Sequence, residues 1–379
     1  MDSIARGNGR MISLVAAFIL LLTAACSALP ANQGLTASGM TSATATSSTG
    51  SSQGISTACS QTSTASACQL GHGDAAVTLS VEPAAGTKPI ATAINAAQKS
   101  IFLEMYLLTQ HTVINALEDA ASRGVDVRVM LESAPYGGSS PNATLDKLNA
   151  AGIKAKIANP AFEFTHAKMM IIDGNAVIIS TANFTQSALG GSSYTTNREY
   201  IVADTNTQDI QECTAIFAAD WNRTNPQLAD PNLVVSPINS FVKTMALIQK
   251  AQSSIDLEEE EMLDPDVVNA LIAAQHRGIT VQVVVPAPNN GSADQSYEQQ
   301  LIQAGAKVEQ IDSSQGSGYL YIHAKDIIID NTLAYIGSVN ISGSSFYRNR
   351  EIGVLIADPA ALQQLLATFQ HDIQGAAIQ

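Results

Sequence analysis

Basic residues are scarce in this sequence. Its 379 residues include 19 Lys and Arg against 33 Asp and Glu, which gives a formal net charge of -14. A surface of that sign repels phosphate backbones at long range, so a general nucleic-acid-binding protein is disfavoured, although a locally basic cleft is not excluded. Tryptophan is nearly absent, but 46% hydrophobic residues in a chain of this length suffice to build a sizeable core.

Long apolar runs are also scarce. The run Ile12 to Leu22 is too short to span a bilayer comfortably. Two arginines precede it and small residues follow it, which predicts a signal peptide over residues 1–25. Export is therefore expected, as a secreted, periplasmic or lipid-anchored protein. The segment that ends at Cys26 resembles a bacterial lipoprotein signal, in which the cysteine is lipidated; ordinary cleavage without lipidation is the alternative.

Cysteine is rare, with four in the chain. Cys59 and Cys68 lie nine positions apart in a polar stretch, and in an oxidising compartment they can close a small disulfide loop. Cys213 falls in an apolar helical pattern and is expected to be a buried thiol. No spacing of cysteine and histidine is typical of a zinc site. The GxSxG, P-loop and HExxH motifs are missing as well, so serine-based and metal-dependent hydrolysis lack support.

Composition changes sharply near residue 76. Residues 26–75 are dominated by Ser, Thr, Ala, Gly and Gln, which predicts a low-complexity, disordered tether. Beyond it, short β-branched runs alternate with helical periods, and this alternation indicates an α/β fold. Strands are predicted at 77–81, 101–107, 125–131 and 153–157, and a helix at 113–122.

The chain contains an internal repeat. Arg123-Gly124 recurs 154 residues later as Arg277-Gly278, and an Ala-Gly pair further along recurs after 153 residues. The offset between the two copies therefore changes very little along the repeat. Two copies of one α/β unit, at residues 76–230 and 231–379, are the simplest account.

Each copy ends with the same arrangement of polar residues. A histidine is followed by Lys two residues on and Asp five further, then by Asn ten after the Asp, with a hydroxyl residue two before that Asn. Because residues i and i+2 of a strand share a face, each histidine and its lysine are expected to project into one cleft. The members are His166, Lys168, Asp173, Thr181 and Asn183 in the first copy and His323, Lys325, Asp330, Ser338 and Asn340 in the second.

This duplicated pattern resembles that of the phospholipase D superfamily, from about residue 76 to the end of the chain. The resemblance implies two pseudo-symmetric lobes, each a mixed β-sheet flanked by helices, with the active site at their interface. It also implies a mechanism without metal or other cofactor. The repeated Asn-Arg-Glu fits the family's trailing acidic residue, so Glu199 and Glu351 are expected to orient the histidines that lie 33 and 28 residues before them.

The chemistry of these residue types suits a phosphodiester. The two lysines and two asparagines, with the hydroxyls of Thr181 and Ser338, are expected to bind the phosphate charge. One imidazole can attack phosphorus while the other protonates the departing alkoxide. We expect His166 to be the nucleophile, following the common order in such proteins, but the reverse assignment stays open. The aspartates of the motif belong to the candidate catalytic set in a supporting role.

A run of four glutamates, 258–261, interrupts the second copy. Its first member matches Glu104 of the first copy, which predicts the end of a strand with the other three residues solvated. Any of these carboxylates that lines the cleft would disfavour a polyanionic substrate.

The leading functional hypothesis is a monomeric phospholipase D that works at a membrane surface. It would hydrolyse a phospholipid to phosphatidic acid and a free head group, with transfer to another alcohol as a side reaction. The alternatives are a secreted metal-independent endonuclease acting on nucleic acid, a cardiolipin-synthase-like phosphatidyltransferase, and a non-catalytic protein that binds a phosphate ligand.

Overall fold

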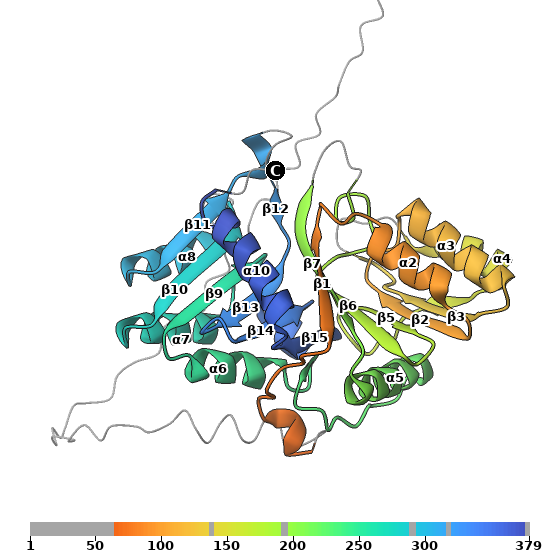
Figure 1. Cartoon of the computed structure of the whole chain (residues 1–379), viewed down its shortest axis with the longest axis horizontal. Helices are drawn as coiled ribbons and strands as arrows, with labels where there is room; N and C mark the ends of the chain where they lie inside the picture. Colours follow the sequence, from red (N-terminus) through yellow and green to blue (C-terminus); the bar gives the residue numbers. More distant parts are fainter. Residues whose placement is uncertain (1–63, 136–139, 191–195, 288–292, 316–319, 376–379) are drawn as a thin grey trace, which may run out of the picture. The chain divides into compact units, whose positions relative to one another are not determined.

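The computed structural model describes residues 64–135, 140–190, 196–287, 293–315 and 320–375 (Figure 1). The predicted signal peptide, the predicted lipidation site Cys26 and Cys59 lie outside these ranges, so the pairing of Cys59 stays a prediction. Cys68 is disulfide-bonded.

The first half begins with a short 3-10 helix and continues as alternating strands and helices, in agreement with the predicted pattern. The predicted strands lie within two residues of the observed ones. Helix α3 buries Val113, Leu117 and Ala120 on one face, as the spacing indicates. The elements are η1 (Ser66–Cys68), β1 (Val77–Glu82), α2 (Lys88–Ala96), β2 (Ser100–Met105), α3 (His111–Ser122), β3 (Asp126–Leu131), α4 (Asn142–Ala150), β4 (Lys154–Ile157), β5 (Lys168–Ile172), β6 (Ala176–Ser180), β7 (Asn197–Asp204) and α5 (Thr207–Asn222).

The second half repeats this succession with small additions. Its elements are β8 (Leu233–Ser236), α6 (Ser240–Lys250), β9 (Ser254–Glu259), α7 (Pro265–His276), β10 (Thr280–Pro286), α8 (Ala293–Gln303), β11 (Lys307–Ile311), η2 (Ser313–Gln315), β12 (Tyr321–Ile322), β13 (Lys325–Ile329), β14 (Leu333–Gly337), α9 (Gly343–Tyr347), β15 (Glu351–Ile356) and α10 (Pro359–Asp372).

The described strands form two mixed sheets with matching orders. The first runs β1-β7-β6-β5-β2-β3-β4, and the second, taken from its other edge, runs β8-β15-β14-β13-β9-β10-β11. In each sheet the three strands around the helical crossovers are parallel, and the motif strands β5 and β13 pair antiparallel with their neighbours. The two pseudo-symmetric units expected from the repeat are confirmed.

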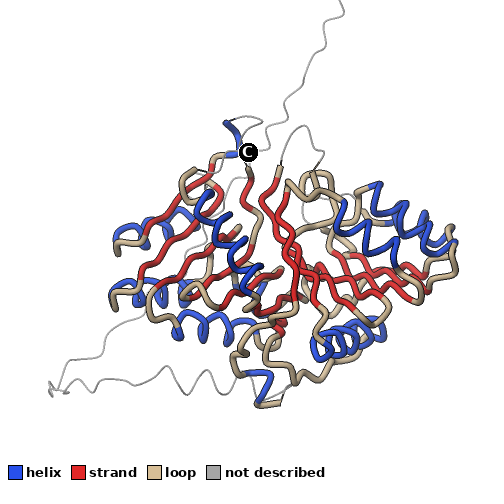
Figure 2. The backbone as a smooth tube through the Cα atoms, viewed as in Figure 1, coloured by secondary structure: helices blue, strands red, loops and turns tan. Residues whose placement is uncertain are grey.

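Hydrophobic residues gather in three clusters. Figure 2 shows the helices in blue beside the strands in red. One cluster lies between the first sheet and helices α2, α3 and α4, and a second lies between the other sheet and α6, α7 and α8. The central cluster combines the inner faces of both sheets with α5 and α10 and includes the fully buried thiol of Cys213, as predicted. Because both halves share this core, we propose that 76–230 and 231–379 are repeated units of one folded body.

The packed structure begins before the predicted end of the tether at residue 75. Ala67 is fully buried, and its carbonyl accepts a hydrogen bond from the side chain of Asn239. The backbone of Asp74 pairs with Ile356 at the end of β15. Residues 64–75 therefore pack against the second half through hydrogen bonds. Their own composition did not indicate these contacts.

A short segment of each half pairs with a strand of the other half. Strand β12 pairs in parallel with the start of β7, and Thr165 forms the corresponding bridge with Arg350 at the start of β15. Two buried ion pairs lie across the same junction, between Arg198 and Asp372 and between Arg350 and Asp220. These exchanged contacts place each histidine segment beside the Asn-Arg-Glu of the opposite half.

Candidate active site

The two histidines are paired with glutamates across the repeat. Nδ1 of His166 is 2.8 Å from Oε2 of Glu351, and Nδ1 of His323 is 2.8 Å from Oε1 of Glu199. The sequence-based expectation assigned each glutamate to the preceding histidine of its own half, and that pairing is wrong. It fails because β12 and Thr165 cross to the opposite sheet, and each histidine follows directly after one of these crossing segments.

Both glutamates are fully buried and held in place by side chains of their own half. Asn197 and Asn349, the first residues of the repeated tripeptide, each donate to the glutamate two residues on at 3.0 Å. Burial raises the pKa of Glu351, but the His166 imidazole and the Lys168 ammonium outweigh it and hold the pKa below its usual range. Glu351 is therefore an ionised acceptor that can fix the tautomer of His166.

The lysines occupy equivalent places but have different surroundings. Each Nζ donates to the carbonyl of its own histidine, at 2.7 Å for Lys168 and 2.6 Å for Lys325. Burial lowers the pKa of Lys168 to about 7. Burial acts on Lys325 in the same direction, but Glu260 at 2.6 Å outweighs it and raises the pKa. One lysine thus already has an anionic partner, whereas the other lies beside an aromatic ring.

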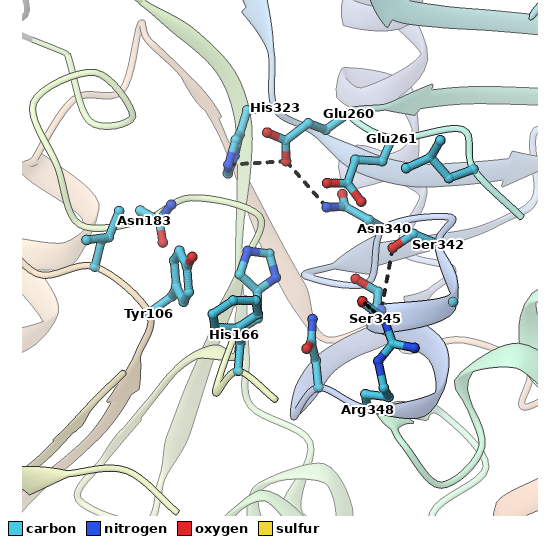
Figure 3. A pocket seen from close by; sticks show the side chains of 16 residues that line it. Tyr106, His166, Asn183, Glu260, Glu261, His323, Asn340, Ser342, Ser345 and Arg348 are labelled. Atoms are coloured by element: carbon cyan, nitrogen blue, oxygen red, sulfur yellow. Dashed lines mark hydrogen bonds and ion pairs between the residues drawn. The ribbon is translucent and has the colours of Figure 1, made fainter. Parts of the chain in front are cut away.

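Glu260 lies inside the site, where the sequence predicted a solvated residue. Its Oε2 is 2.6 Å from Nζ of Lys325. The same oxygen is 3.4 Å from Nε2 of His323 and 3.5 Å from Nδ2 of Asn340 (Figure 3). Burial raises the pKa of Glu260, but His323 and Lys325 outweigh it and hold the pKa far below its usual range. A carboxylate oxygen therefore stands among the donors that were expected to bind phosphate.

Tyr106 takes the corresponding place in the first half. Its ring meets the His166 ring edge-on, with 4.7 Å between centroids, and Nζ of Lys168 is 5.1 Å from the centre of the Tyr106 ring. The offset of 154 residues that relates the two copies joins Tyr106 to Glu260. Extending the match between Glu104 and Glu258 by two positions would have revealed this difference. The two halves thus contribute unlike environments to one site.

Both histidines line the same pocket, which has a volume of about 580 Å³. Asn183 and Asn340 line it as predicted, on opposite sides in the view of Figure 3. No donor among the described residues reaches Oδ1 of Asn183. The shared site expected from the duplicated motif is therefore present, with amide groups directed to it from both halves.

Thr181 and Ser338 do not face the pocket, in contrast to the expectation. The Thr181 hydroxyl donates to Glu199 at 2.6 Å, and the Ser338 hydroxyl contacts the backbone of Ile352. Both hydroxyls also accept from the backbone of the neighbouring strand. Both hydroxyls therefore form their hydrogen bonds within the sheets, and Thr181 contacts a glutamate rather than a phosphate.

The motif aspartates lie away from the histidines. Asp173 accepts from the backbone N–H groups of residues 98–100, and Asp330 accepts from those of residues 252–254. Each aspartate directly follows a five-residue strand that begins with the motif lysine. At a rise of about 3.3 Å per residue, the aspartate therefore lies roughly 16 Å from that lysine along the strand. Both adopt a positive φ, near 53° and 51°. They shape the turns before β2 and β9 and have no place in the catalytic set.

Comparison with known proteins supports the resemblance. The family described as "Cardiolipin synthase, PLD-like domain" matches residues 90–221 and 244–373. The chain is 23% identical over 327 residues to cardiolipin synthase 2 of Bacillus cereus, covering 76% of this chain and 62% of that protein. It is 26% identical over 333 residues to cardiolipin synthase of Clostridium perfringens, covering 74% and 67%. The chain thus spans less than two thirds of the Bacillus cereus relative.

Solved structures show the same fold at low sequence identity. Phosphatidylserine synthase of Haemophilus influenzae aligns with a TM-score of 0.64 and 12% identity, covering 86% of this chain and 91% of that one. Polyphosphate kinase of Porphyromonas gingivalis aligns with a TM-score of 0.61 and 16% identity, covering 79% and 47%.

The comparisons correct the expectation of export. The matched relatives are named as cardiolipin synthases rather than as secreted hydrolases. The secreted, periplasmic and lipid-anchored interpretations are therefore not retained. Within the described ranges, no helix has the length and apolar character needed to cross a membrane. Taken together, the duplicated motif, the paired sheets and the matched residues show that the chain belongs to the phospholipase D-like family of the cardiolipin synthase type.

Proposed function

We propose that this protein is a phosphatidyltransferase of the cardiolipin synthase type. It transfers a phosphatidyl group from a phospholipid to an alcohol through a phosphohistidine. The single observation that carries the proposal is that His166 and His323 line one pocket, each oriented by a carboxylate of the opposite half. The names of the matched relatives favour transfer over the phospholipase D hydrolysis that was the leading hypothesis.

His166 is suited to be the nucleophile. Burial lowers its pKa, which keeps the imidazole neutral near pH 7. Its Nδ1 hydrogen-bonds to Glu351, so the proton lies on Nδ1 and the lone pair remains on Nε2. That lone pair can attack phosphorus and form the P–N bond of a phosphohistidine.

His323 is suited to be the general acid. Nδ1 lies beside Glu199 and Nε2 lies 3.4 Å from Glu260, so carboxylate oxygens face both ring nitrogens. A ring that carries protons on both nitrogens satisfies both contacts. As the P–O bond to the leaving group breaks, the alkoxide takes the Nε2 proton. The neutral ring then accepts the proton of the incoming alcohol, whose oxygen attacks phosphorus and releases His166.

The phosphoryl oxygens are bound by Lys168, Lys325, Asn183 and Asn340. These groups approach from both halves and neutralise charge as it shifts in the pentavalent transition state. Because Glu260 holds Lys325 in the substrate-free protein, a phosphoryl oxygen must displace that carboxylate from the ammonium. Substrate binding is thus an exchange of one anion for another at Lys325.

The lining of the pocket supports a lipid substrate at a membrane surface. Tyr106, Leu107, Phe164 and Leu263 add apolar and aromatic surface beside the histidines. Glu260 and Glu261 line the same pocket and repel a second phosphate, so a polynucleotide is disfavoured. We propose that the protein acts on phospholipid as a monomer.

Vesicles that contain phosphatidylglycerol test the proposal, because this lipid supplies both a phosphatidyl group and an alcohol. Transfer yields cardiolipin, whereas hydrolysis yields phosphatidic acid, and lipid mass spectrometry separates the two. We expect cardiolipin to be the main product. Phosphatidic acid alone would restore the hydrolase hypothesis. Cleavage of single-stranded DNA in chelator, without lipid turnover, would indicate a nuclease.

A further inference from the structure

A second group of acidic side chains lies away from the histidines, at the end of β7. One carboxylate oxygen from each of Asp74, Asp204 and Asp209 lies within 4.8 Å of the other two. The three residues are 6%, 0% and 0% exposed. They come from the segment before β1, the last position of β7 and the first turn of α5. Three carboxylates are thus gathered from three separate parts of the chain into a space without solvent.

The hydrogen-bonding neighbours of Asp209 are carboxyl groups, those of Asp74, Asp204 and Asp230. Among the described residues, no N–H or hydroxyl reaches either of its oxygens, and one oxygen each of Asp74 and Asp204 also receives none. Asn206 supplies the nearby donors, but its backbone N–H and side-chain amide serve the other oxygen of Asp204 and of Asp74. A buried carboxylate without a donor is strongly destabilising unless a proton or a cation compensates it.

The neighbouring residues add further negative charge. Asp230 lies beside Asp209 and is 1% exposed, and one of its oxygens also receives no hydrogen bond from the described residues. The nearby ammonium of Lys243 donates to the backbone carbonyls of residues 230, 231 and 233 rather than to a carboxylate. Four buried acidic side chains thus lie together, and the Lys243 ammonium that interacts with Asp230 and Asp209 makes its hydrogen bonds to the backbone.

The internal repeat shows that the fold does not require these acids. Counting 152 residues from the first Asn-Arg-Glu to the second takes Asp204 to Ile356 and Asp209 to Ala361. The N-caps of α5 and α10, Asn206 and Asp358, follow the same offset. The second half builds the same strand–helix junction with apolar residues, so the carboxylates of the first half serve something beyond the junction.

We propose that Asp74, Asp204 and Asp209 bind one divalent cation, with Asp230 at the edge of the site. An all-oxygen set of carboxylates suits a hard cation. Calcium fits better than magnesium, because it accepts irregular carboxylate cages and gives up its water more readily. The ion joins residues 64–75 to the β7–α5 junction and so has a structural role. It takes no part in the histidine chemistry.

Calcium binding by the full chain tests this site. Protein treated with EDTA and then freed of the chelator is titrated with CaCl₂ by calorimetry, and its thermal unfolding is followed with CaCl₂ or MgCl₂. We expect one calcium per chain and a melting temperature that rises with calcium concentration, by linkage. Magnesium should act more weakly. An unchanged melting temperature with both ions, together with no binding heat, would overturn the proposal.

Variants distinguish calcium binding at this site from general effects of ions on the protein. Asp209→Ala copies Ala361 of the second half and should weaken calcium binding at least about 100-fold, because it removes a central ligand. Without metal, the same variant should unfold at a higher temperature than the parent, since a buried carboxylate is gone. Asp146→Ala, on the exposed face of α4, should bind calcium as the parent does. Equal binding by Asp209→Ala and the parent would refute the site. If Asp209→Ala fails to fold, Asp204→Asn provides the same comparison.

Discussion

His166 in the first half hydrogen-bonds to Glu351 in the second half at 2.8 Å, although 185 residues separate them in the chain. The reciprocal contact joins His323 to Glu199. Neither half can therefore orient its own histidine. In the proposed mechanism, this relationship makes the two repeats a single unit.

Replacing Glu351 by glutamine should impair the nucleophile. The variant leaves Nδ1 of His166 without its anionic partner, so we expect turnover to fall by roughly 100-fold or more. Trapping of the phosphohistidine by acid quench should show slower formation of the intermediate. With a p-nitrophenolate leaving group, which needs no acid, Glu199→Gln should instead form the phosphohistidine at nearly the parental rate. If Glu199→Gln slowed phosphohistidine formation on His166 and Glu351→Gln did not, the crossed pairing would be wrong.

The two histidines should differ in their response to the leaving group. His166→Ala and His323→Ala should each lower phospholipid turnover by several orders of magnitude while the protein stays folded. A phosphodiester with a p-nitrophenolate leaving group needs no proton from an acid. His323→Ala should therefore still release p-nitrophenol in a single burst, whereas His166→Ala should not. A burst from the His166 variant would reverse the two assignments.

Glu260 should compete with anions for Lys325. Glu260→Gln removes the carboxylate charge at similar size, so sulfate should bind at least about 10-fold more tightly by calorimetry. Glu260→Tyr, which copies Tyr106, should act in the same direction. Glu261→Gln is the matched control and should raise sulfate affinity less, because Glu261 lines the pocket whereas Glu260 accepts the hydrogen bond from Lys325. Sulfate affinity that is unchanged in both Glu260 variants would show that the carboxylate does not occupy the phosphate position.

Sulfate binding should weaken as the pH rises above about 7. Burial lowers the pKa of Lys168 to about 7, so its charge is present below that pH and is lost above it, whereas the raised pKa of Lys325 keeps that charge. Sulfate itself does not titrate in this range. Affinity measured between pH 6 and 9 should fall for the parent and depend less on pH in Lys168→Gln. The same slope in both proteins would assign the effect to another group.

The buried pair between Arg350 and Asp220 should be needed for stability. Asp220→Ala leaves a guanidinium that is 1% exposed without its partner, and breaking such a pair costs about 3–5 kcal/mol of unfolding free energy. Glu163→Ala removes the partner of the exposed Arg348 and should cost less than about 1 kcal/mol. Urea denaturation measures both. Equal losses of unfolding free energy in the two variants would mean that burial does not determine how much an ion pair contributes to stability.

Local patterns predicted the elements and the reacting groups. Alternating β-branched runs and helical periods depend on neighbouring residues, so the four predicted strands and α3 agree with the structure within two residues. The duplicated spacing of His, Lys and Asn then predicted one shared site, because the same residue types recur at equivalent points of a repeat. The sequence by itself thus determined the fold class and the two histidines and two asparagines that line one pocket.

Contacts between distant residues were decided by the tertiary structure. The exchange of β12 and Thr165 between the sheets crossed the glutamate pairs, and no local pattern records which sheet a two-residue strand joins. Thr181 was assigned to phosphate because its spacing was regular, but its hydroxyl has a partner in its own sheet. Glu260 was expected in solvent because charge runs usually are, yet the ammonium of Lys325 offsets the cost of its burial. These contacts depend on residues that are distant in the sequence. They form only when the chain has folded, so the sequence pattern alone did not predict them.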